Sequence, residues 1–290
     1  MLRIAGERGL AVRALARQAQ PPLAGVDWIA GSLSDPAALA ALCAGTDAVI
    51  HIAGVINARS RAEFDAGNVA GTAMMIAAAR AAGVRRFIHV SSLSAREPGL
   101  SDYGASKRAA EDEVAASGLD WTMVRPPGVY GAGDRETLPI YQMIARGLAI
   151  LPGDGRFSLI EVGDLAGALL ALAASDTGRA MTFEVDDGQA GGYSHADLAL
   201  AIGQAIGRKP RLIRLPLAVL RAGATVDTAL ARLTRRLPKL SFDRARYLAH
   251  PDWVVTAGAA IPAPVWQPQV SLPQGVAAAV KWYRAQAWLD

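Results

Sequence analysis

The sequence has little of several residue types from which functional sites are commonly built. One cysteine stands among 290 residues, so no disulfide can form within the chain, and this favours a cytoplasmic location. Four scattered histidines and a single cysteine argue against a His/Cys metal site, and no metal is expected. The apolar runs fall well short of the ~20 residues that a membrane-spanning helix needs. Charged Glu7 and Arg8 follow the first residues at once, which argues against a signal peptide.

Charge and composition describe a globular chain without a nucleic-acid surface. Hydrophobic residues make up 52% and charged residues 19%, which is enough apolar material for a large buried core. The net charge of +4 permits an anionic partner. However, the basic clusters at 208–211 and 232–239 have no interleaved aromatic residues, and no helix-turn-helix or zinc-finger pattern is present. Nucleic acid is therefore not an expected partner.

Short apolar runs alternate with longer Ala/Leu-rich stretches over the first 130 residues. Strands are predicted at 11–16, 26–30, 47–53, 86–92 and 121–124, and helices at 38–44, 68–82 and 103–116. Ser34, Asp35 and Pro36 form a suitable start for the first of these helices. This alternation predicts an α/β fold with a doubly wound parallel sheet, whose strand carboxyl ends share the edge at which such sheets bind ligands.

Beyond residue 130 the predicted strands and helices no longer alternate regularly. Helices are predicted at 137–148, 164–174 and 195–207, with a short strand at 181–185 and Ser194 as an N-cap. The stretch 216–237 is amphipathic and basic; a solvated face, a lid, a partner-binding helix or a membrane-surface helix would all fit it. We expect a Rossmann-like domain at 1–189, with 127–165 partly lining a substrate cleft. A smaller, mainly helical substrate or lid domain is expected at 190–290.

Three side chains form a candidate catalytic site. Tyr103 and Lys107 lie one helical turn apart, and Ser92 follows a predicted strand. A phenol with a pKa of about 10 becomes a useful acid or base when a nearby cation stabilises its phenolate. Lys107 could lower that pKa, and Ser92 could hold a carbonyl or hydroxyl against Tyr103. An exposed helical Tyr and Lys is the structural alternative.

Several segments, in the right order, resemble the extended short-chain dehydrogenase/reductase superfamily, in its NAD-dependent epimerase/dehydratase group. They cover nearly the whole chain, and the branch they resemble most is the bacterial one similar to the 39-kDa accessory subunit of respiratory complex I. The matching segments are His51-Ile52-Ala53-Gly54, Asn68-Val69-Ala70-Gly71-Thr72, Ser91-Ser92 with Tyr103-x-x-x-Lys107, Arg125-Pro126-Pro127-Gly128-Val129-Tyr130-Gly131, Val162-Gly163-Asp164, and Trp282-Tyr283-Arg284.

The resemblance implies a set of cofactor-binding residues. Ala53 and Gly54 would lie beside a nicotinamide dinucleotide, with Tyr103 and Lys107 at its ribose. Backbone at Pro126, Gly128 and Val129 would cradle the nicotinamide. Ser32 and Leu33 occupy the place where the family often has an acid near the adenine.

The choice between NAD and NADP depends on the residue at the end of the second strand of the family's fold, which corresponds to the strand predicted at 11–16. An acid there binds the ribose hydroxyls of NAD, whereas an arginine accommodates the 2′-phosphate of NADP. Arg17 occupies that position, so NADP is favoured over NAD. An arginine that simply faces solvent after a strand is the alternative.

One departure from the family pattern is large. Its members begin with a strand and a G-x-x-G-x-x-G turn that holds the pyrophosphate. Here residues 4–9 read as the tail of the helix that follows that turn, so the chain starts about 25 residues late. A mis-assigned start or a form with a crippled cofactor site would explain this. Loss of the first strand would expose neighbouring strand edges.

The expected function is that of an NAD(P)-dependent oxidoreductase or epimerase acting on a secondary alcohol or ketone. Tyr103 would be the general acid/base and Ser92 would polarise the carbonyl, with Ser94 as the fallback. The alternative is a non-catalytic nucleotide-binding or assembly subunit similar to the complex I relative. Expected partners are a small-molecule substrate and a homodimer or membrane-complex association.

Overall fold

The computed structural model describes residues 1–215, 217–234, 246–247 and 250–290. Parts of the predicted 216–237 helix and of the 232–239 basic cluster lie outside these residues. The chain forms two compact units that are interleaved along the sequence: residues 1–125, 166–183 and 261–267 make the first, and residues 126–165, 184–260 and 268–290 make the second. The sequence predicted one break near residue 189; the chain instead passes between the units several times.

A four-stranded sheet forms the centre of the first unit. Its order is β10-β5-β4-β3, and β3, β4 and β5 pair in parallel. All five residues of β4 are buried, as expected for an inner strand of a parallel sheet. The strands are β3 (Ala48–His51), β4 (Arg86–Val90), β5 (Asp120–Arg125) and β10 (Met181–Glu184).

A second, two-stranded sheet belongs to the same unit. β1 (Val12–Ala16) and β2 (Val26–Ala30) pair in parallel along their full lengths. Within the described residues β1 has no sheet partner other than β2, and β3 has none other than β4.

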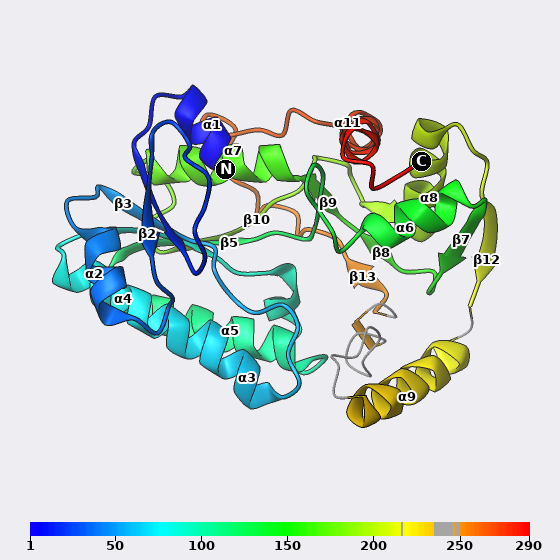
Figure 1. Ribbon diagram of the computed structural model, residues 1–290, viewed down its shortest axis with the longest axis horizontal. Coiled ribbons are helices and arrows are strands. Elements are labelled where there is room, and N and C mark those ends of the chain that lie inside the picture. The colour runs from blue at the N-terminus through cyan, green and yellow to red at the C-terminus, as the bar shows by residue number, and fades with distance from the viewer. Residues whose placement is uncertain (216, 235–245, 248–249) are drawn as a thin grey trace. The chain divides into compact units, whose positions relative to one another are not determined.

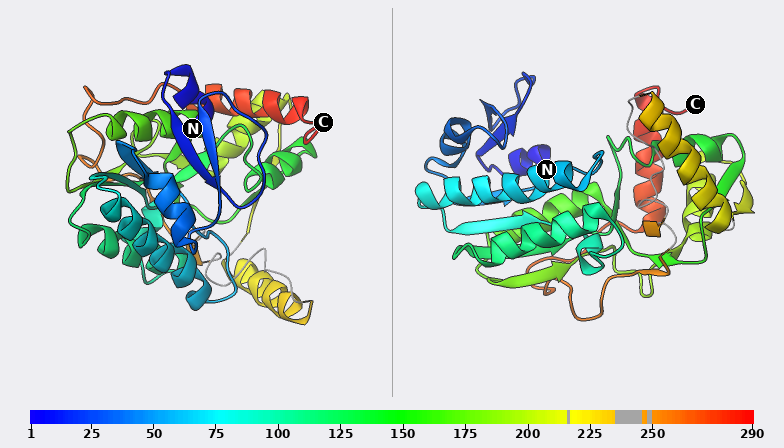
Figure 2. Two further views of the ribbon diagram at one scale, coloured as in Figure 1. Left: turned by 60° about the vertical axis from the view of Figure 1, so that its left-hand side comes forward. Right: turned by 90° about the horizontal axis from the view of Figure 1, so that it is seen from below.

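Helices cover both faces of the four-stranded sheet. α4 (Gly71–Ala81) and α5 (Asp102–Ala115) lie on one face and α7 (Val162–Ala173) on the other (Figure 1). Figure 2 shows α4 and α5 side by side. The apolar core under α4 includes Leu39, Met75, Phe87 and Val114. The predicted doubly wound α/β fold is thus confirmed. The remaining helices of this unit are α1 (Leu2–Glu7), α2 (Pro36–Cys43), α3 (Arg61–Asp65), the π-helical turn η1 (Ala66–Ala70) and the 3-10 helix η2 (Leu93–Arg96).

Side-chain caps explain where several helices begin. Asp35 accepts hydrogen bonds from two backbone N–H groups at the start of α2, as predicted. For α5 the predicted cap, Asp102, is wrong: it is the first helical residue. Ser101 is the cap, because its extended backbone lets its hydroxyl accept from the Gly104 N–H at 3.0 Å.

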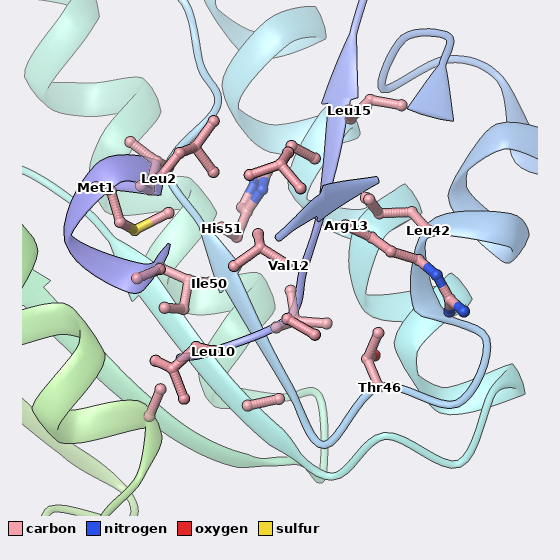
Figure 3. A pocket seen from close by; sticks show the side chains of 18 of the residues that line it. Met1, Leu2, Leu10, Val12, Arg13, Leu15, Leu42, Thr46, Ile50 and His51 are labelled. Carbon is pink, nitrogen blue, oxygen red and sulfur yellow. The ribbon is translucent and has the colours of Figure 1, made fainter. Parts of the chain in front are cut away.

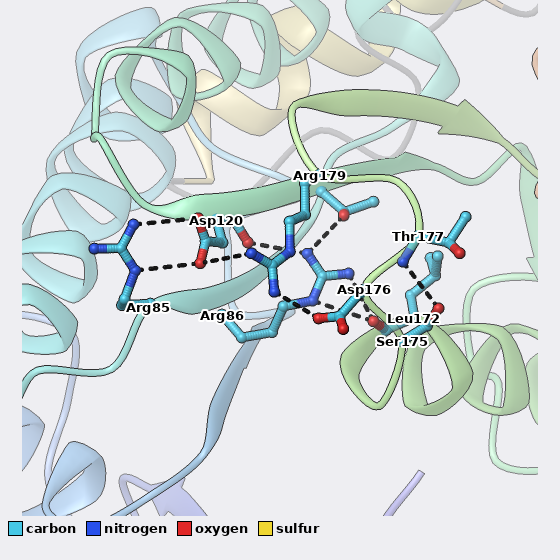
Figure 4. Close-up of polar contacts among 9 residues, drawn as sticks. Arg85, Arg86, Asp120, Leu172, Ser175, Asp176, Thr177 and Arg179 are labelled. Carbon is cyan, nitrogen blue, oxygen red and sulfur yellow. Dashed lines mark hydrogen bonds and ion pairs between the residues drawn. The ribbon is translucent and has the colours of Figure 1, made fainter.

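A buried arginine fixes α7 to the sheet (Figure 4). The Arg86 guanidinium on β4 donates to the Leu172 carbonyl oxygen at 2.6 Å and to the Thr122 hydroxyl and Asp120 carbonyl at 2.9 Å each. Leu172 lies in the last turn of α7, where carbonyl groups have no helical partner. Burial of this cation is tolerated because carbonyl and hydroxyl oxygens accept hydrogen bonds from its N–H groups.

The second unit combines short strands with helices. Its core is centred on Tyr141, Ile144, Ile202, Val276 and Tyr283. Its strand pairings are β6 (Gly128–Tyr130) with β9 (Leu159–Glu161), β7 (Leu148–Leu151) with β12 (Arg211–Arg214), and β8 (Arg156–Phe157) with both β11 (Tyr193–Ser194) and β13 (Asp252–Trp253). Its helices are α6 (Leu138–Ala145), α8 (His195–Ile206), α9 (Leu217–Leu233) and α11 (Leu272–Ala285).

Sequence reasoning predicted α6 and α8 but not these short strands or α11. Ser194 caps α8 in a capping box with Asp197, as predicted, and Gly207 ends it with a φ of 83°. Within the described part of the chain, no helix is both long and apolar enough to cross a membrane.

Candidate functional site

Ser92 lies just beyond the carboxyl end of β4. Its backbone is extended, with φ −158° and ψ 150°, and it is the N-cap of η2. Its hydroxyl oxygen accepts hydrogen bonds from the Ser94 N–H at 3.2 Å and the Ser94 hydroxyl at 2.9 Å. These contacts hold the Ser92 oxygen in place, and its own hydrogen is left to donate elsewhere. Ser94, the alternative to Ser92 for polarising the carbonyl, therefore holds the Ser92 hydroxyl in place through two hydrogen bonds.

Tyr103 occupies the first turn of α5, with its phenol hydrogen-bonded to the Ser92 side chain. The Phe64 ring packs against it, with centroids 6.0 Å apart and planes at 56°. Burial raises the pKa of the Tyr103 phenol, and the Ser92 hydrogen bond offsets this only in part. Lys107 is not among the causes of this shift, so the lowering of the Tyr103 pKa by Lys107 stays a prediction.

Lys107 lies one turn further along α5 and is 5% exposed. Its Nζ donates to the Val90 carbonyl oxygen, at the end of β4, at 2.7 Å. Burial lowers the pKa of the Lys107 ammonium to about 8, while Glu111 acts to raise it. Burial and the Lys107 charge also lower the pKa values of His51 and His89, that of His51 to about 3.

The lowered pKa of Lys107 predicts a pH-dependent stability. The unfolded chain binds this proton up to the ordinary pKa of 10.5, whereas the folded chain releases it near 8. The free energy of unfolding should therefore rise as the pH increases from about 8 to about 10.5, by ~2–3 kcal/mol. Urea unfolding across this range should show the rise in the native chain and a smaller one in Lys107→Met. An equal rise in both proteins would show that Lys107 is not responsible.

A buried ion pair holds the site helix against the sheet. Glu111 on α5 accepts two hydrogen bonds from Arg125 at the end of β5, at 2.8 and 2.6 Å. The two side chains are 5% and 15% exposed, respectively. This two-point contact fixes the rotation of α5, and thereby the direction in which Tyr103 and Lys107 project.

Asn68 connects the loop after β3 to α5. Its amide oxygen accepts from the Val55 N–H at 2.6 Å, and its amide nitrogen donates to the Val55 carbonyl at 3.0 Å. The same nitrogen donates to the Ser106 hydroxyl at 2.8 Å, which in turn donates to the Tyr103 carbonyl at 2.8 Å. Sequence reasoning placed Asn68 only within a family motif. Its buried link to Tyr103 depends on a hydrogen bond to Ser106, which lies 38 residues further along the chain.

Asn68 sits within a π-helical turn. α3, η1 and α4 follow one another without interruption from residue 61 to residue 81. The sequence predicted a single regular helix from 68 to 82; the helical region begins earlier and contains η1. A π turn carries one residue more than an α turn and is frequent at functional sites. Here it directs both Phe64 and Asn68 towards α5.

The predicted adenosine contacts follow the strands of the first unit. Arg17 is exposed directly after β1, and half-buried Ser32 and Leu33 follow β2. Ala53 and Gly54 are exposed after β3. A Cβ at Gly54 would lie 2.7 Å from the Asn68 amide oxygen, so only glycine fits there.

Predicted nicotinamide contacts fall in the second unit. Gly128 and Val129 belong to β6, where they pair with Leu159 and Ile160. Pro126 precedes these two residues in the sequence and is the first residue of the second unit.

Residues of the first unit fit part of a nicotinamide dinucleotide. The exposed backbone at Ala53 and Gly54 offers close approach, and Arg17 offers a guanidinium for a phosphate. The Ser92 and Tyr103 hydroxyls offer polar contacts, and the buried Lys107 ammonium lies one helical turn beyond Tyr103 on α5. For the pyrophosphate, no glycine-rich turn precedes α1 among the described residues.

Comparison with known proteins identifies the chain's relatives. A family model described as NAD(P)H-binding matches residues 1–171. Ceramide reductase of Caulobacter vibrioides (strain NA1000 / CB15N) is 41% identical over 267 residues, which make up 91% of this chain and 82% of that protein.

Two solved structures share the fold. The crystal structure of gox2253 has a TM-score of 0.76 at 21% identity and covers 100% of this chain and 95% of its own. MoeE5 in complex with UDP-glucose and NAD has a TM-score of 0.73 at 21% identity and covers 99% and 94%. The chain thus belongs to the NAD(P)H-binding family, as an enzyme of the short-chain dehydrogenase/reductase type that uses a nicotinamide cofactor in an oxidoreductase or epimerase reaction.

Proposed function

We propose that this protein reduces a ketone to a secondary alcohol on a ceramide-type lipid, with NADPH as the preferred reductant. The observation that carries the reaction type is the hydrogen-bonded pair of Ser92 and Tyr103 hydroxyls, one helical turn from the buried Lys107 ammonium. The ceramide reductase that is 41% identical over most of this chain supports the substrate class.

The Tyr103 phenol donates the proton in this reaction. Its raised pKa keeps it protonated at neutral pH, which suits an acid in the reductive direction. A bound nicotinamide supplies the hydride to the carbonyl carbon. As that bond forms, the C=O π electrons move to oxygen, which takes the Tyr103 proton and becomes the alcohol.

Ser92 and Lys107 support this proton transfer. The Ser92 hydroxyl donates a hydrogen bond to the same carbonyl oxygen and stabilises its developing charge. One N–H of the Lys107 ammonium is bound to Val90, and two remain for ribose hydroxyls and for the phenolate that forms on Tyr103. A non-catalytic subunit would need none of these three side chains in this arrangement.

NADPH oxidation with a defined lipid ketone tests the function. A long-chain ketone with a ceramide backbone, in detergent micelles, should support turnover. A short ketone without acyl chains should be a much poorer substrate. UDP-glucose with NAD is the second control. Turnover with UDP-glucose and none with the lipid ketone would overturn the proposal in favour of a sugar-nucleotide enzyme.

Cofactor preference is tested at Arg17. A guanidinium on the 2′-phosphate contributes about 1.5–3 kcal/mol, so Arg17→Ala should raise the KM for NADPH about 10–100-fold. The KM for NADH should change little. Arg3→Ala is the matched control, because Arg3 is also exposed and forms an ion pair with Glu7, a neighbour on α1. Equal effects on NADPH and NADH would show that Arg17 does not distinguish the two.

A further inference from the structure

The outer face of the β7–β12 sheet is apolar. Ala149 and Leu151 of β7 are buried in the core of the second unit. The alternate residues, Leu148 and Ile150, therefore point outward, and they are 42% and 44% exposed. Ile213 of β12 pairs with Ile150, which places it on the same face, and it is 36% exposed. Figure 1 shows the two strands at the margin of the second unit, beyond α6 and α8.

Basic side chains gather at one end of this face. β7 and β12 are parallel and Leu148 pairs with Arg211, so both strands begin at the same end. Arg146 lies just before β7, and Arg208 and Lys209 lie just before β12; all three are exposed. Arg211 is itself exposed, on the same face as Leu148. The β7–β12 face thus consists of Leu148, Ile150, Arg211 and Ile213, and its basic end of Arg146, Arg208 and Lys209.

The charge of this region has one sign. Residues 146–151 and 208–215 contain five basic residues and no acidic one. The fifth, Arg214, forms an ion pair with Asp154 at 3.5 Å, but the two side chains are 79% and 85% exposed, so the pair is weak. A partner that complements this region must combine apolar material with negative charge.

A different setting surrounds an exposed aliphatic residue of the first unit. Leu10, which is 43% exposed, lines a cavity together with side chains of α1, β1 and β3 (Figure 3). Such a hollow encloses what it binds, as small-molecule sites do. The side chains of the β7–β12 face instead stand on the open side of a two-stranded sheet. This arrangement suits contact with a surface.

We propose that the β7–β12 face docks the protein on an anionic lipid bilayer. Leu148, Ile150 and Ile213 enter the boundary between headgroups and acyl chains, and the basic end contacts lipid phosphates. Arg211 fits this boundary because its apolar stem can lie beside the aliphatic side chains while its guanidinium reaches a phosphate. The proposal concerns this surface and is independent of the reaction proposed above.

A bilayer fits the size and charge of the face better than a second protein does. Two strands of four residues span only about 13 Å by 10 Å. A stable protein–protein interface buries about 800 Å² on each partner, which is several times that area. A second copy of the chain would also bring Arg211 and the basic end close to groups of the same charge. Binding to a membrane surface instead grows with each aliphatic and basic side chain and needs no extended interface.

Sedimentation of the full chain with lipid vesicles tests the docking. Vesicles of phosphatidylcholine with about one third phosphatidylglycerol should bind the chain at least about tenfold more tightly than pure phosphatidylcholine, and rising salt should release it. Lys209→Glu combined with Arg211→Glu should weaken this binding at least about tenfold. Ile150→Glu should do the same, because a carboxylate at that position keeps the face in water. All three positions are exposed, so the urea midpoint should not change.

Matched controls separate the effect of this face from that of overall charge and hydrophobicity. Arg3→Glu combined with Arg80→Glu lowers the net charge by the same amount, at exposed positions of the first unit. Leu200→Glu changes an aliphatic residue of α8 that is 46% exposed. Both controls should bind anionic vesicles nearly as tightly as the native chain does.

A dye gives a direct measurement on the folded chain. Cys43 is buried, so an environment-sensitive thiol dye should label Ile150→Cys and Leu200→Cys at the new thiol. Anionic vesicles should shift the dye emission to shorter wavelength in the first variant but not in the second.

The proposal is wrong if anionic vesicles do not bind the chain, or if the face variants weaken binding no more than their controls do. A dimer that Ile150→Glu dissociates, with no dye shift in vesicles, would show instead that the face joins two copies of the chain. None of these measurements contains a ketone substrate, so failure of the reaction proposed above would leave them unaffected.

Discussion

Tyr103→Phe should lower turnover by about 10²–10⁴-fold while leaving nucleotide affinity within about twofold of the native value. The change removes only the phenolic oxygen, so the ring keeps its contact with Phe64 and α5 keeps its length. Without that proton the carbonyl oxygen must take one from water. Single-turnover reduction with bound NADPH, measured beside nucleotide titration, separates the chemical step from binding.

A second Tyr→Phe variant provides the control. The Tyr141 hydroxyl is buried in the second unit with no hydrogen-bond partner among the described residues. Tyr141→Phe should therefore leave turnover near the native value and leave stability equal or slightly higher. If Tyr103→Phe retained native turnover, Tyr103 would not be the proton donor. A loss of both turnover and nucleotide binding would indicate a role in folding instead.

Glu111→Gln should destabilise the fold by about 3–5 kcal/mol, because it removes the charge of a carboxylate that is only 5% exposed and binds the Arg125 guanidinium at two points. A glutamine keeps the size of the side chain but cannot form the same paired contact with Arg125. The variant should also lower the pKa of Lys107 further, since Glu111 acts to raise it. Urea unfolding measures the first effect, and NMR titration of the Lys107 ammonium measures the second.

The neighbouring residue of α5 offers a matched comparison. Asp112 pairs with Arg108 at 3.3 Å, and their side chains are 67% and 51% exposed. Asp112→Asn removes the same charge from the same helix and should cost no more than about 1 kcal/mol. Equal losses for Glu111→Gln and Asp112→Asn would show that burial does not set the strength of the first pair. Glu111→Leu combined with Arg125→Leu should recover part of the stability.

Local signals in the sequence were sufficient to predict most strands and helices of the first unit. The strand at 26–30 has the predicted bounds, and Asp35 and Ser194 cap the predicted helices. These features depend on residues within one turn or one strand of each other. The Ser92–Tyr103 contact was also foreseeable, because both follow from strand ends and helix starts on one sheet edge.

Features that depend on distant residues were not foreseeable. Burial raises the pKa of Tyr103, and the spacing of residues in the sequence does not reveal that burial. The Asn68 amide bridges Val55 and Ser106, and nothing near Asn68 in the sequence indicates this. Strands of two to four residues, such as β8 and β12, are too short to show a period.

The π turn before α4 makes the site sensitive to insertions and deletions rather than to residue type. Each residue of a helix turns its neighbours by about 100°, so removing any one of Ala66–Ala70 would rotate α3 by that angle about the helix axis. The Phe64 ring would then swing away from Tyr103 even though every remaining side chain was unchanged. Relatives that carry this site should therefore preserve the length of this segment even where its composition drifts.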